Sequence, residues 1–427
     1  MTHDRQESGF KHRTRVADAL AAIREAATPH SRTERVAVAD ADGRTVAETI
    51  TAPNPVPGYD RAAMDGYAVR ARDTFGASER SPSVLTPTED RVGPEEAARV
   101  HTGSDLPAGA DAVVMIEQVE ELDFDGDDEI EELEVFDAVA EGENVGDAGE
   151  DVAEGQTLYE PRHRFRPSDL GLLKSVGLEE VTVYEHPSVA VLPTGEELVQ
   201  SDPGPGEVIE TNGLTVTRLA ERWGGDATYR EIVTDDEDAL RNAIERDLDH
   251  DVVVTTGGSS VGERDLVPDV VDGIGEVLVH GVALKPGHPV ALGAVEDTPV
   301  VMLPGYPVAC IVNAVQFLRP VLKDVGAMPL PPHPTRTARL TRKIPSEPGT
   351  RTFARVRLEV DPDDRNADDT GSEDGENPSF AATPTRASGS GVLSSVALAD
   401  GWVVVPEPVE GFDAGEVVTV EVWEGSQ

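Results

Sequence analysis

The 427-residue chain is poor in cysteine, lysine and aromatic residues, the last making up only 4% of it. Its single cysteine, Cys310, excludes an intramolecular disulfide and a multi-cysteine zinc site. No run of about 18 apolar residues is present, which excludes a transmembrane helix. The first residues, MTHDRQESGFKHRTR, lack the apolar segment of a secretory signal. We therefore expect a cytoplasmic protein without a membrane partner.

The charge balance is strongly acidic. Asp and Glu number 82 against 36 Lys and Arg, which gives a formal net charge of −46. A main partner made of nucleic acid is excluded, because a phosphate backbone attracts the opposite charge. Disorder is not indicated, since 38% of the residues are hydrophobic and they fall in compact runs. An acidic, lysine-poor surface predicts adaptation to high salt, where at 1 M the Debye length is about 3 Å and surface repulsion is screened.

The apolar spacing divides the chain into regions. Length alone predicts about three domains, and the patterns refine this number. Helical spacing at 15–27 and again near 167–177 flanks a stretch of short β runs, whose acidic part at 120–134 is expected to be a solvated hairpin. We expect a small all-β domain at about 65–143 that is inserted between flanking pieces, then an α/β region at about 187–325 and a final β-rich stretch after Pro332.

The α/β region carries strands that alternate with helices, the latter expected near 214–223, 237–248 and 307–322. Several strands are continuously apolar, which predicts a parallel sheet covered on both faces. Ligands of such sheets bind beyond the carboxyl ends of the strands. The β-rich C-terminal region is interrupted at 361–378 by an acidic stretch with almost no apolar residues, which is typical of a disordered hairpin loop.

Four unusual loops each follow a strand of this region. They are Pro193–Leu198, Thr234–Asp236, the Gly/Ser-rich Thr256–Asp265, and Pro304–Pro307. A Gly/Ser-rich turn that enters a helix offers free backbone N–H groups and a partial positive charge to an anion. Carboxylates on the same edge would repel that anion unless a cation bridges them, as Mg²⁺ does at phosphates. The loops together predict a Mg²⁺-assisted phosphate site.

Several of these residues allow a second interpretation. Either Asp235 or Asp236 could cap the helix that follows instead of binding metal. Lys285, in the proline-clamped loop ALKPGHP, suits an oxyanion as a compact point charge. His288 in that loop is either a second anion donor or an ordinary loop residue. Cys310 is expected to be a buried core thiol.

Eight ordered motifs resemble those of one family. From residue 62 to residue 309 they are AMDGYAVR, TGSDLPAGADAVVM, GEDV, PTGEEL, TNG, TTGGSSVGERD, LKPGHP and LPGYPV. In this order they resemble the molybdopterin molybdenumtransferases of the MoeA family, to which the C-terminal part of gephyrin also belongs. The resemblance implies an elongated homodimer with a discontinuous linking region (1–60 and 146–186), an inserted β domain (61–145), a molybdopterin-binding-like α/β domain (187–328) and a C-terminal β barrel (329–427). It also implies the reaction: molybdate is inserted into adenylylated molybdopterin and AMP is released with the help of Mg²⁺.

The resemblance also assigns roles to individual residues. Asp65, Thr102 and Asp151 would reach the site from the partner subunit, and Lys285 would offset charge on the oxyanions. Glu197, Asp235 and Asp265 would serve the metal and the phosphoanhydride, or position molybdate. The cofactor-binding set that follows is Thr102, Gly103, Thr194, Gly195, Gly257, Gly258, Ser259, Ser260, Pro304, Gly305 and Pro307.

Further residues are suggested less directly. Arg351 and Arg355 lie on a basic strand and are looser candidates. Tyr306 and His288 depart from the pattern of many relatives and bear on pocket shape and on the choice between molybdate and tungstate.

Two other functions remain open at this stage. The α/β domain alone would suit an adenylyltransferase that adenylylates molybdopterin with ATP, but stand-alone adenylyltransferases lack the linking and β domains that carry AMDGYAVR. A separate adenylyltransferase would instead be a candidate partner. A non-catalytic cofactor-binding scaffold would not need Glu197, Asp235, Asp265 and Lys285 together.

Overall fold

The computed structural model describes residues 13–124, 130–258, 266–360, 379–385 and 391–425. The chain forms two compact units. Unit 1 comprises Met1–Glu34, Gly43–Thr45 and Tyr184–Gln427, and unit 2 comprises Arg35–Asp42 and Val46–Val183. Among the described helices, none has both the length and the apolar character needed to cross a bilayer.

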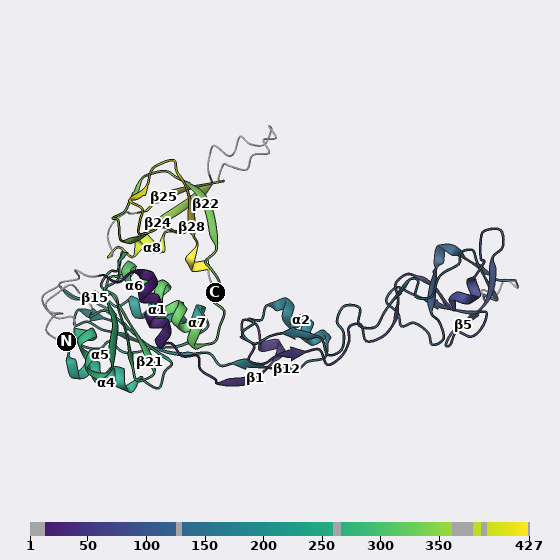
Figure 1. The fold of residues 1–427 in the computed structure, drawn as a ribbon, viewed down its shortest axis with the longest axis horizontal. Coiled ribbons are helices and arrows are strands. Elements are labelled where there is room, and N and C mark those ends of the chain that lie inside the picture. The colour runs from purple at the N-terminus through teal and green to yellow at the C-terminus, as the bar shows by residue number, and fades with distance from the viewer. Residues whose placement is uncertain (1–12, 125–129, 259–265, 361–378, 386–390, 426–427) are drawn as a thin grey trace. The chain divides into compact units, whose positions relative to one another are not determined.

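The centre of unit 1 is a six-stranded sheet (Figure 1). Its strands, in spatial order, are β16 (Asp226–Tyr229), β13 (Ser188–Pro193), β17 (Val252–Thr256), β21 (Thr298–Leu303), β20 (Ala291–Val295) and β18 (Glu276–His280). The first four are parallel, which confirms the predicted parallel sheet. The last two run antiparallel to their neighbours. The sequence interpretation did not separate this pair from the parallel strands.

The antiparallel edge has a local cause. β20 ends at Val295 and β21 begins at Thr298, so only Glu296 and Asp297 connect them. A connection of two residues can close a hairpin between antiparallel strands, whereas parallel neighbours need a crossover of about a dozen residues or more. Glu296 has φ +53, as a tight hairpin turn requires.

Helices cover both faces of this sheet, as predicted. They are α1 (Val16–Ala26), α3 (Asn212–Arg222), α4 (Glu237–Arg246), α5 (Leu266–Ile274), α6 (Pro307–Asn313) and α7 (Arg319–Val325). Val189, Val191 and Val254 face the core that contains α1, α3, α6 and α7. Ala190 and Val253, one residue along, face α4 and α5. This alternation is the strand period of two, and it buries both faces of β13 and β17.

The helix predicted over 307–322 is present, but it is not uniform. A π-helical turn, η4 (Ala314–Leu318), separates α6 from α7, and α7 carries Pro320 in its first turn. Proline lacks the N–H for a normal α-helical bond and crowds the carbonyl four residues before it. Such π turns are rare, occur mostly as single turns inside α-helices and are frequent at functional sites.

The C-terminal region closes into a five-stranded barrel, as predicted. Its strands pair in the cyclic order β24 (Arg351–Val360), β25 (Phe380–Pro384), β22 (Thr335–Leu340), β28 (Val417–Glu421) and β26 (Gly401–Val405). β24 and β25 are antiparallel, so the predicted hairpin is confirmed, whereas its acidic loop lies outside the described residues. The short β19 (Leu284–Lys285) of the α/β domain joins the barrel edge by pairing with β24.

Several short elements complete unit 1. They are β14 (Leu198–Val199), β15 (Val208–Ile209), β23 (Ile344–Pro345), β27 (Gly411–Phe412), α8 (Ser394–Ala397) and η6 (Trp423–Gly425).

Unit 2 contains a second six-stranded sheet, in the order β7-β4-β6-β5-β9-β8. The bounds are β4 (Gly66–Val69), β5 (Ser83–Thr88), β6 (Glu96–Val100), β7 (Ala112–Met115), β8 (Val119–Leu122) and β9 (Glu132–Val135). The antiparallel pair β8–β9 confirms the predicted acidic hairpin. Unit 2 also contains η2 (Ala71–Thr74) and η3 (Ile116–Gln118), and α2 (Pro167–Ser175) and η1 (Val38–Asp40) share a separate small core.

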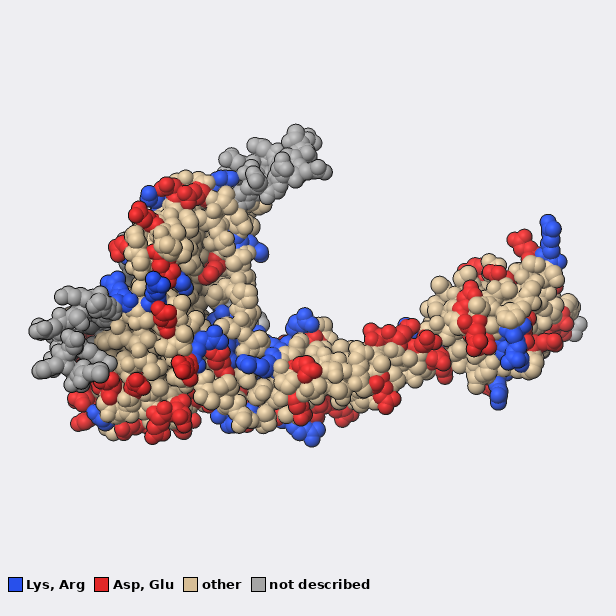
Figure 2. Space-filling model, in the orientation of Figure 1, with Lys and Arg blue, Asp and Glu red and all other residues tan. Residues whose placement is uncertain are grey.

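Short two-stranded pairings complete the described chain. β2 (Ile50–Thr51) pairs with β11 (Thr157–Tyr159), β3 (Arg61–Ala62) with β10 (Val145–Gly146), and β1 (Thr33–Ala37) with β12 (Glu180–Tyr184). On the face drawn in Figure 2, acidic side chains gather over the part of unit 1 that carries α4 and α5.

Candidate functional site

Three of the four predicted loops meet at the carboxyl ends of neighbouring parallel strands. Pro193 of β13 pairs with Thr256 of β17, and Thr256 pairs with Leu303 of β21. The residues that follow these strand ends therefore leave the sheet side by side. Two backbone bonds tie them together: the Thr194 N–H donates to the Thr256 carbonyl (3.0 Å), and the Gly257 N–H donates to the Leu303 carbonyl (3.0 Å).

The glycines at this edge are required by close packing. Gly257 has φ +111, and a Cβ there would lie 2.1 Å from the Thr194 carbonyl oxygen. A Cβ at Gly258 would lie 2.6 Å from Cγ2 of Val267, and one at Gly305 would lie 3.4 Å from Cα of Gly257. The three loops thus form one floor that is made of backbone, which a ligand can approach closely.

The fourth loop brings a carboxylate to the same floor. The Gly195 N–H donates to the Val233 carbonyl (3.2 Å), which places the loop after Val233 beside Glu197. Burial raises the pKa of Asp235, the negative charges of Glu197 and Glu196 raise it further, and only a hydrogen bond from the Glu196 backbone N–H opposes them. Carboxylates that repel one another in this way are stabilised by a cation.

The structure shows which of Asp235 and Asp236 caps the helix that follows them. Asp236 is the N-cap of α4, and its carboxylate accepts the Ala239 N–H (2.9 Å). The Asp235 carboxylate is left beside Glu197 and Glu196, whose charges act on it.

Buried hydroxyl groups lie at the ends of β13 and β17; Thr194 was among the predicted cofactor-binding residues, whereas Thr255 and Thr256 were missed. The Oγ1 atoms of Thr194, Thr255 and Thr256 are buried and have no hydrogen-bond partner within the described chain. Buried polar atoms are normally paired, so unpaired ones at a strand end indicate a place for a ligand or water. The signal in the sequence is the change from valine to threonine in VVVTT.

A second missed group holds the Pro304–Pro307 loop. The side-chain amide of Asn212, at the start of α3, donates to the Gly305 carbonyl (2.7 Å). The buried Glu210 carboxylate accepts the Gly213 N–H (2.6 Å) and the hydroxyl of Tyr229. Burial and this carboxylate raise the pKa of Tyr229 to about 12, so it remains a donor at neutral pH. The hydrogen bond of Asn212 thus ties α3 to the Pro304–Pro307 loop, and the Glu210 carboxylate holds the start of α3.

Lys285 has surroundings that the sequence did not predict. It belongs to β19 at the barrel edge, and its Nζ lies 3.2 Å from Oε1 of Glu347. The loop after it packs on α6, where Asn313 Nδ2 donates to the Gly287 carbonyl (3.0 Å). Burial lowers the pKa of His288, and the charges of Arg13 and Lys285 lower it further, so this imidazole is neutral at pH 7.

The remaining candidate residues of unit 1 differ in exposure and in hydrogen-bond partners. Pro304 precedes Gly305, and Pro307 begins α6, while the Tyr306 side chain between them is 63% exposed. Arg351 pairs with Glu407 (3.0 Å), whereas Arg355 is buried and donates to the Phe353 carbonyl (3.2 Å). Cys310 is buried in the core, as predicted, and burial raises the pKa of its thiol.

Unit 2 holds the other candidates. Asp65 Oδ1 accepts the Thr102 backbone N–H (2.6 Å) and the Thr102 hydroxyl (2.9 Å), and these bonds lower the pKa of Asp65. The turn continues through Gly103, with φ +86. Asp151 donates its backbone N–H to Val56 (3.0 Å). Ser259, Ser260 and Asp265 lie outside the described residues.

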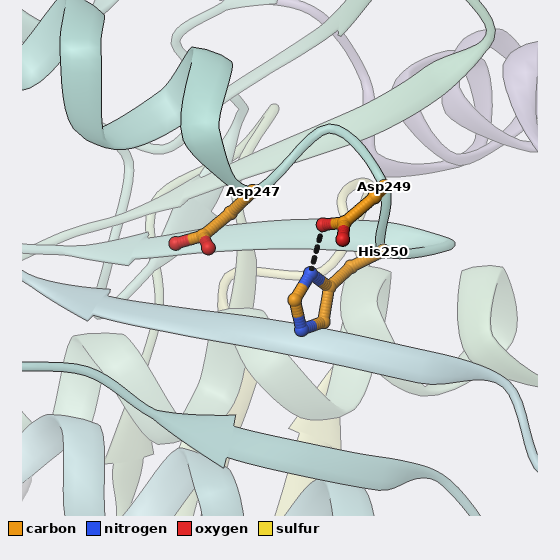
Figure 3. A group of neighbouring side chains, drawn as sticks. All are labelled: Asp247, Asp249 and His250. Atoms are coloured by element: carbon orange, nitrogen blue, oxygen red, sulfur yellow. Dashed lines mark hydrogen bonds and ion pairs between the residues drawn. The ribbon is translucent and has the colours of Figure 1, made fainter.

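Asp247, Asp249 and His250 form a separate cluster whose ligand atoms could approach one metal ion (Figure 3). Asp247 is fully buried and pairs with Arg230 (2.6 Å) and Arg246 (2.7 Å). Two guanidinium groups on one carboxylate oppose a cation. The cluster also precedes β17, at the end of the sheet away from the glycine floor. It is explained as a buried ion-pair network.

Known proteins match the chain along nearly all of its length. The family model of the MoeA N-terminal region (domain I and II) matches residues 14–177, that of a probable molybdopterin binding domain matches 190–324, and that of the MoeA C-terminal region (domain IV) matches 337–423. A putative molybdopterin biosynthesis protein of Methanocaldococcus jannaschii is 35% identical over 403 residues, 92% of each chain. The molybdopterin molybdenumtransferase of Bacillus subtilis is 31% identical over 401 residues, which cover 91% of this chain and 89% of that one.

A solved structure agrees with these matches. The molybdopterin biosynthesis MoeA protein of Pyrococcus horikoshii superposes with a TM-score of 0.81 at 33% identity, covering 97% of this chain and 100% of that one. Three consecutive family segments, full-length relatives and a full-length structural match lead to one conclusion: the chain belongs to the MoeA family.

Proposed function

We propose that this protein is a molybdopterin molybdenumtransferase, which inserts molybdate into adenylylated molybdopterin and releases AMP, with Mg²⁺ as cofactor. Its place in molybdenum cofactor biosynthesis follows from the family and from relatives that are named as transferases. One observation carries the finer proposal. The backbone floor of Thr194, Gly257 and Gly305 lies beside the carboxylates Glu197 and Asp235.

The donor groups present fit Mg²⁺. Glu197 and Asp235 offer carboxylate oxygens, and the unpaired Thr194 hydroxyl is a further hard oxygen ligand. The raised pKa of Asp235 marks a local excess of negative charge that a divalent cation would relieve. When bound, Mg²⁺ would act as a Lewis acid on phosphate oxygens. We propose Asp265 as a third carboxylate of this set.

The residues of the chain bind and orient the substrate. The glycine floor lets its anionic part approach the backbone closely, and the hydroxyls of Thr194, Thr255 and Thr256 add donors. Asn212 keeps the Pro304–Pro307 loop in place against this floor. The reaction requires no protein nucleophile. Lys285, 3.2 Å from Glu347, would offset oxyanion charge after exchanging that partner.

The proposal includes a homodimer in which Asp65, Thr102 and Asp151 of unit 2 complete the site of the partner subunit. Asp65 and Thr102 are already fixed to each other by two hydrogen bonds. We also propose the five-region division at residues 60, 145, 186 and 328. A cytoplasm of high salt fits the net charge of −46.

The test is release of AMP from adenylylated molybdopterin by the purified protein in molar KCl, with and without molybdate and Mg²⁺. Asp235→Asn and Asp236→Asn form a matched pair, since each removes one charge and Asn still caps a helix. We expect molybdate-dependent release that falls at least about a hundredfold in Asp235→Asn, because a metal contributes several kcal/mol at the transition state. Asp236→Asn should keep it.

Other results would overturn the proposal. Absence of release from folded dimeric protein would refute the molybdenum transfer. Consumption of ATP in its place would support the adenylyltransferase alternative. Equal loss in both variants would refute the assigned metal ligand.

A further inference from the structure

A cavity of about 170 Å³ lies between the α/β domain and the barrel of unit 1. Its polar walls are Gln316 of the π turn, Arg319 at the start of α7, His333, Arg351 of β24 and Glu421 of β28. Arg319 stands 12 residues after Pro307, or about 18 Å along a helix. The cavity is therefore separate from the glycine floor where we place the transferase reaction.

Arg319 is the unusual member of this wall. Its side chain is only 4% exposed, and one terminal nitrogen donates to the Pro331 carbonyl (2.7 Å). Its Nε is buried without a partner, and no carboxylate of the described chain lies within salt-bridge distance. Burial lowers the pKa of this guanidinium, and the distant Glu421 only partly opposes the effect. A buried charge without a counter-ion is costly, and an anion in the cavity would compensate it.

The other charged groups restrict which anion fits. Arg351 is already neutralised by Glu407 (3.0 Å). Burial, together with Arg319, lowers the pKa of His333 to about 4, so the imidazole adds no charge at neutral pH. Glu421 accepts the Trp402 indole N–H (2.9 Å) and presents the rest of its carboxylate as an acceptor. A suitable ligand must accept from Arg319 and donate to Glu421.

From these contacts we propose that the cavity binds inorganic phosphate in a protonated form. Phosphate keeps at least one proton at neutral pH, so an oxygen can accept from the guanidinium of Arg319 while a P–OH donates to Glu421. Sulfate and molybdate carry no proton at neutral pH, so each would place an oxygen lone pair against the Glu421 carboxylate. The volume suits a free tetrahedral ion, since each water occupies about 30 Å³ in the liquid. The π turn that precedes Arg319 supplies Gln316 to the same wall.

The experiment is isothermal titration of the full chain with potassium phosphate, sulfate and molybdate, each at the same KCl concentration. We expect saturable binding of one phosphate per chain, tighter than sulfate or molybdate. Arg319→Met removes the charge at similar length and should weaken phosphate binding about tenfold or more, as loss of a charge-assisted bond does. Arg218→Met is the matched control, because that arginine is exposed and pairs with Glu221.

A second variant tests the direction of the hydrogen bond to Glu421. Glu421→Gln keeps an acceptor for Trp402 and adds an N–H donor, so it should reduce the preference for phosphate over sulfate by about tenfold. It also tests the proposal if Arg319→Met does not fold. Absence of saturable phosphate binding, sulfate binding as tight as phosphate, or a preference unchanged in Glu421→Gln would each overturn it. None of these readouts involves AMP release, so the transferase proposal is tested separately.

Discussion

Substitution of Gly257 by alanine tests whether the backbone floor depends on this glycine. The residue has φ +111, a conformation that costs an L-residue about 1–3 kcal/mol. The added Cβ would also lie 2.1 Å from the Thr194 carbonyl oxygen, more than 1 Å inside ordinary van der Waals contact. Relief requires β13 and β17 to separate at their ends, which strains the bonds Thr194–Thr256 and Gly257–Leu303, each contributing about 1 kcal/mol. We expect a total loss of about 3–5 kcal/mol in stability.

Gly206→Ala is the matched control in the same domain. Gly206 has φ +94, but a Cβ there meets nothing within 4 Å, so only the conformational cost of about 1–2 kcal/mol remains. Urea denaturation followed by tryptophan fluorescence measures both variants, and titration with molybdopterin measures the site. Gly257→Ala should lose molybdopterin binding under conditions where it is folded, and Gly206→Ala should keep it. Equal stability losses, or unimpaired binding by Gly257→Ala, would refute the close-packed floor.

Three further predictions concern charge. Burial would raise the pKa of Asp169, but bonds from Arg166 and His163 outweigh it and hold the pKa well below its usual range. The Asp169 carboxylate therefore stabilises the folded protein above its unfolded pKa of about 3.9, and this stabilisation is lost as pH falls from there toward the lower folded pKa. The free energy of unfolding, measured with urea at several acidic pH values, should depend less steeply on pH in Asp169→Asn than in the wild type. An equal slope in both proteins would contradict the assignment. Asp247→Ala should destabilise unit 1 by about 1–3 kcal/mol, because it removes charge-assisted hydrogen bonds from two partly exposed arginines, while added Mn²⁺ should not stabilise the wild type. A loss under about 0.5 kcal/mol in urea denaturation would argue against the network. The thermal midpoint should rise with KCl, since salt screens a net charge of −46, and a flat dependence from low to molar salt would exclude the high-salt interpretation.

Local patterns predicted most of the architecture. The apolar period of 3.6 marked α1, because a helix must bury one face, and the C-terminal region was recognised as β-rich, whereas its closure into a barrel was an implication of the resemblance. Unbroken apolar runs marked β13 and β17, which are covered on both sides. The same runs did not reveal that β20 returns antiparallel, since strand direction depends on the connection and not on composition.

The candidate site was predicted in part for a related reason. Glycine-rich loops after parallel strands must meet at one edge, so the Gly257 and Gly305 loops could be placed together from the sequence. Asn212 was missed because its partner is a carbonyl 93 residues away. The roles of individual residues in the reaction, including those of Ser259, Ser260 and Asp265, stay predictions.

The sequence by itself determined the fold class, the family and the edge of the sheet that carries the glycine floor. These depend on residue type and spacing, which are local properties of the chain. Only the tertiary structure decided that Asp236 caps α4, that Lys285 faces Glu347, and that Nε of Arg319 is buried without a hydrogen-bond partner among the described residues. Each of these depends on which side chain stands opposite, and packing between elements distant in the chain sets that neighbour.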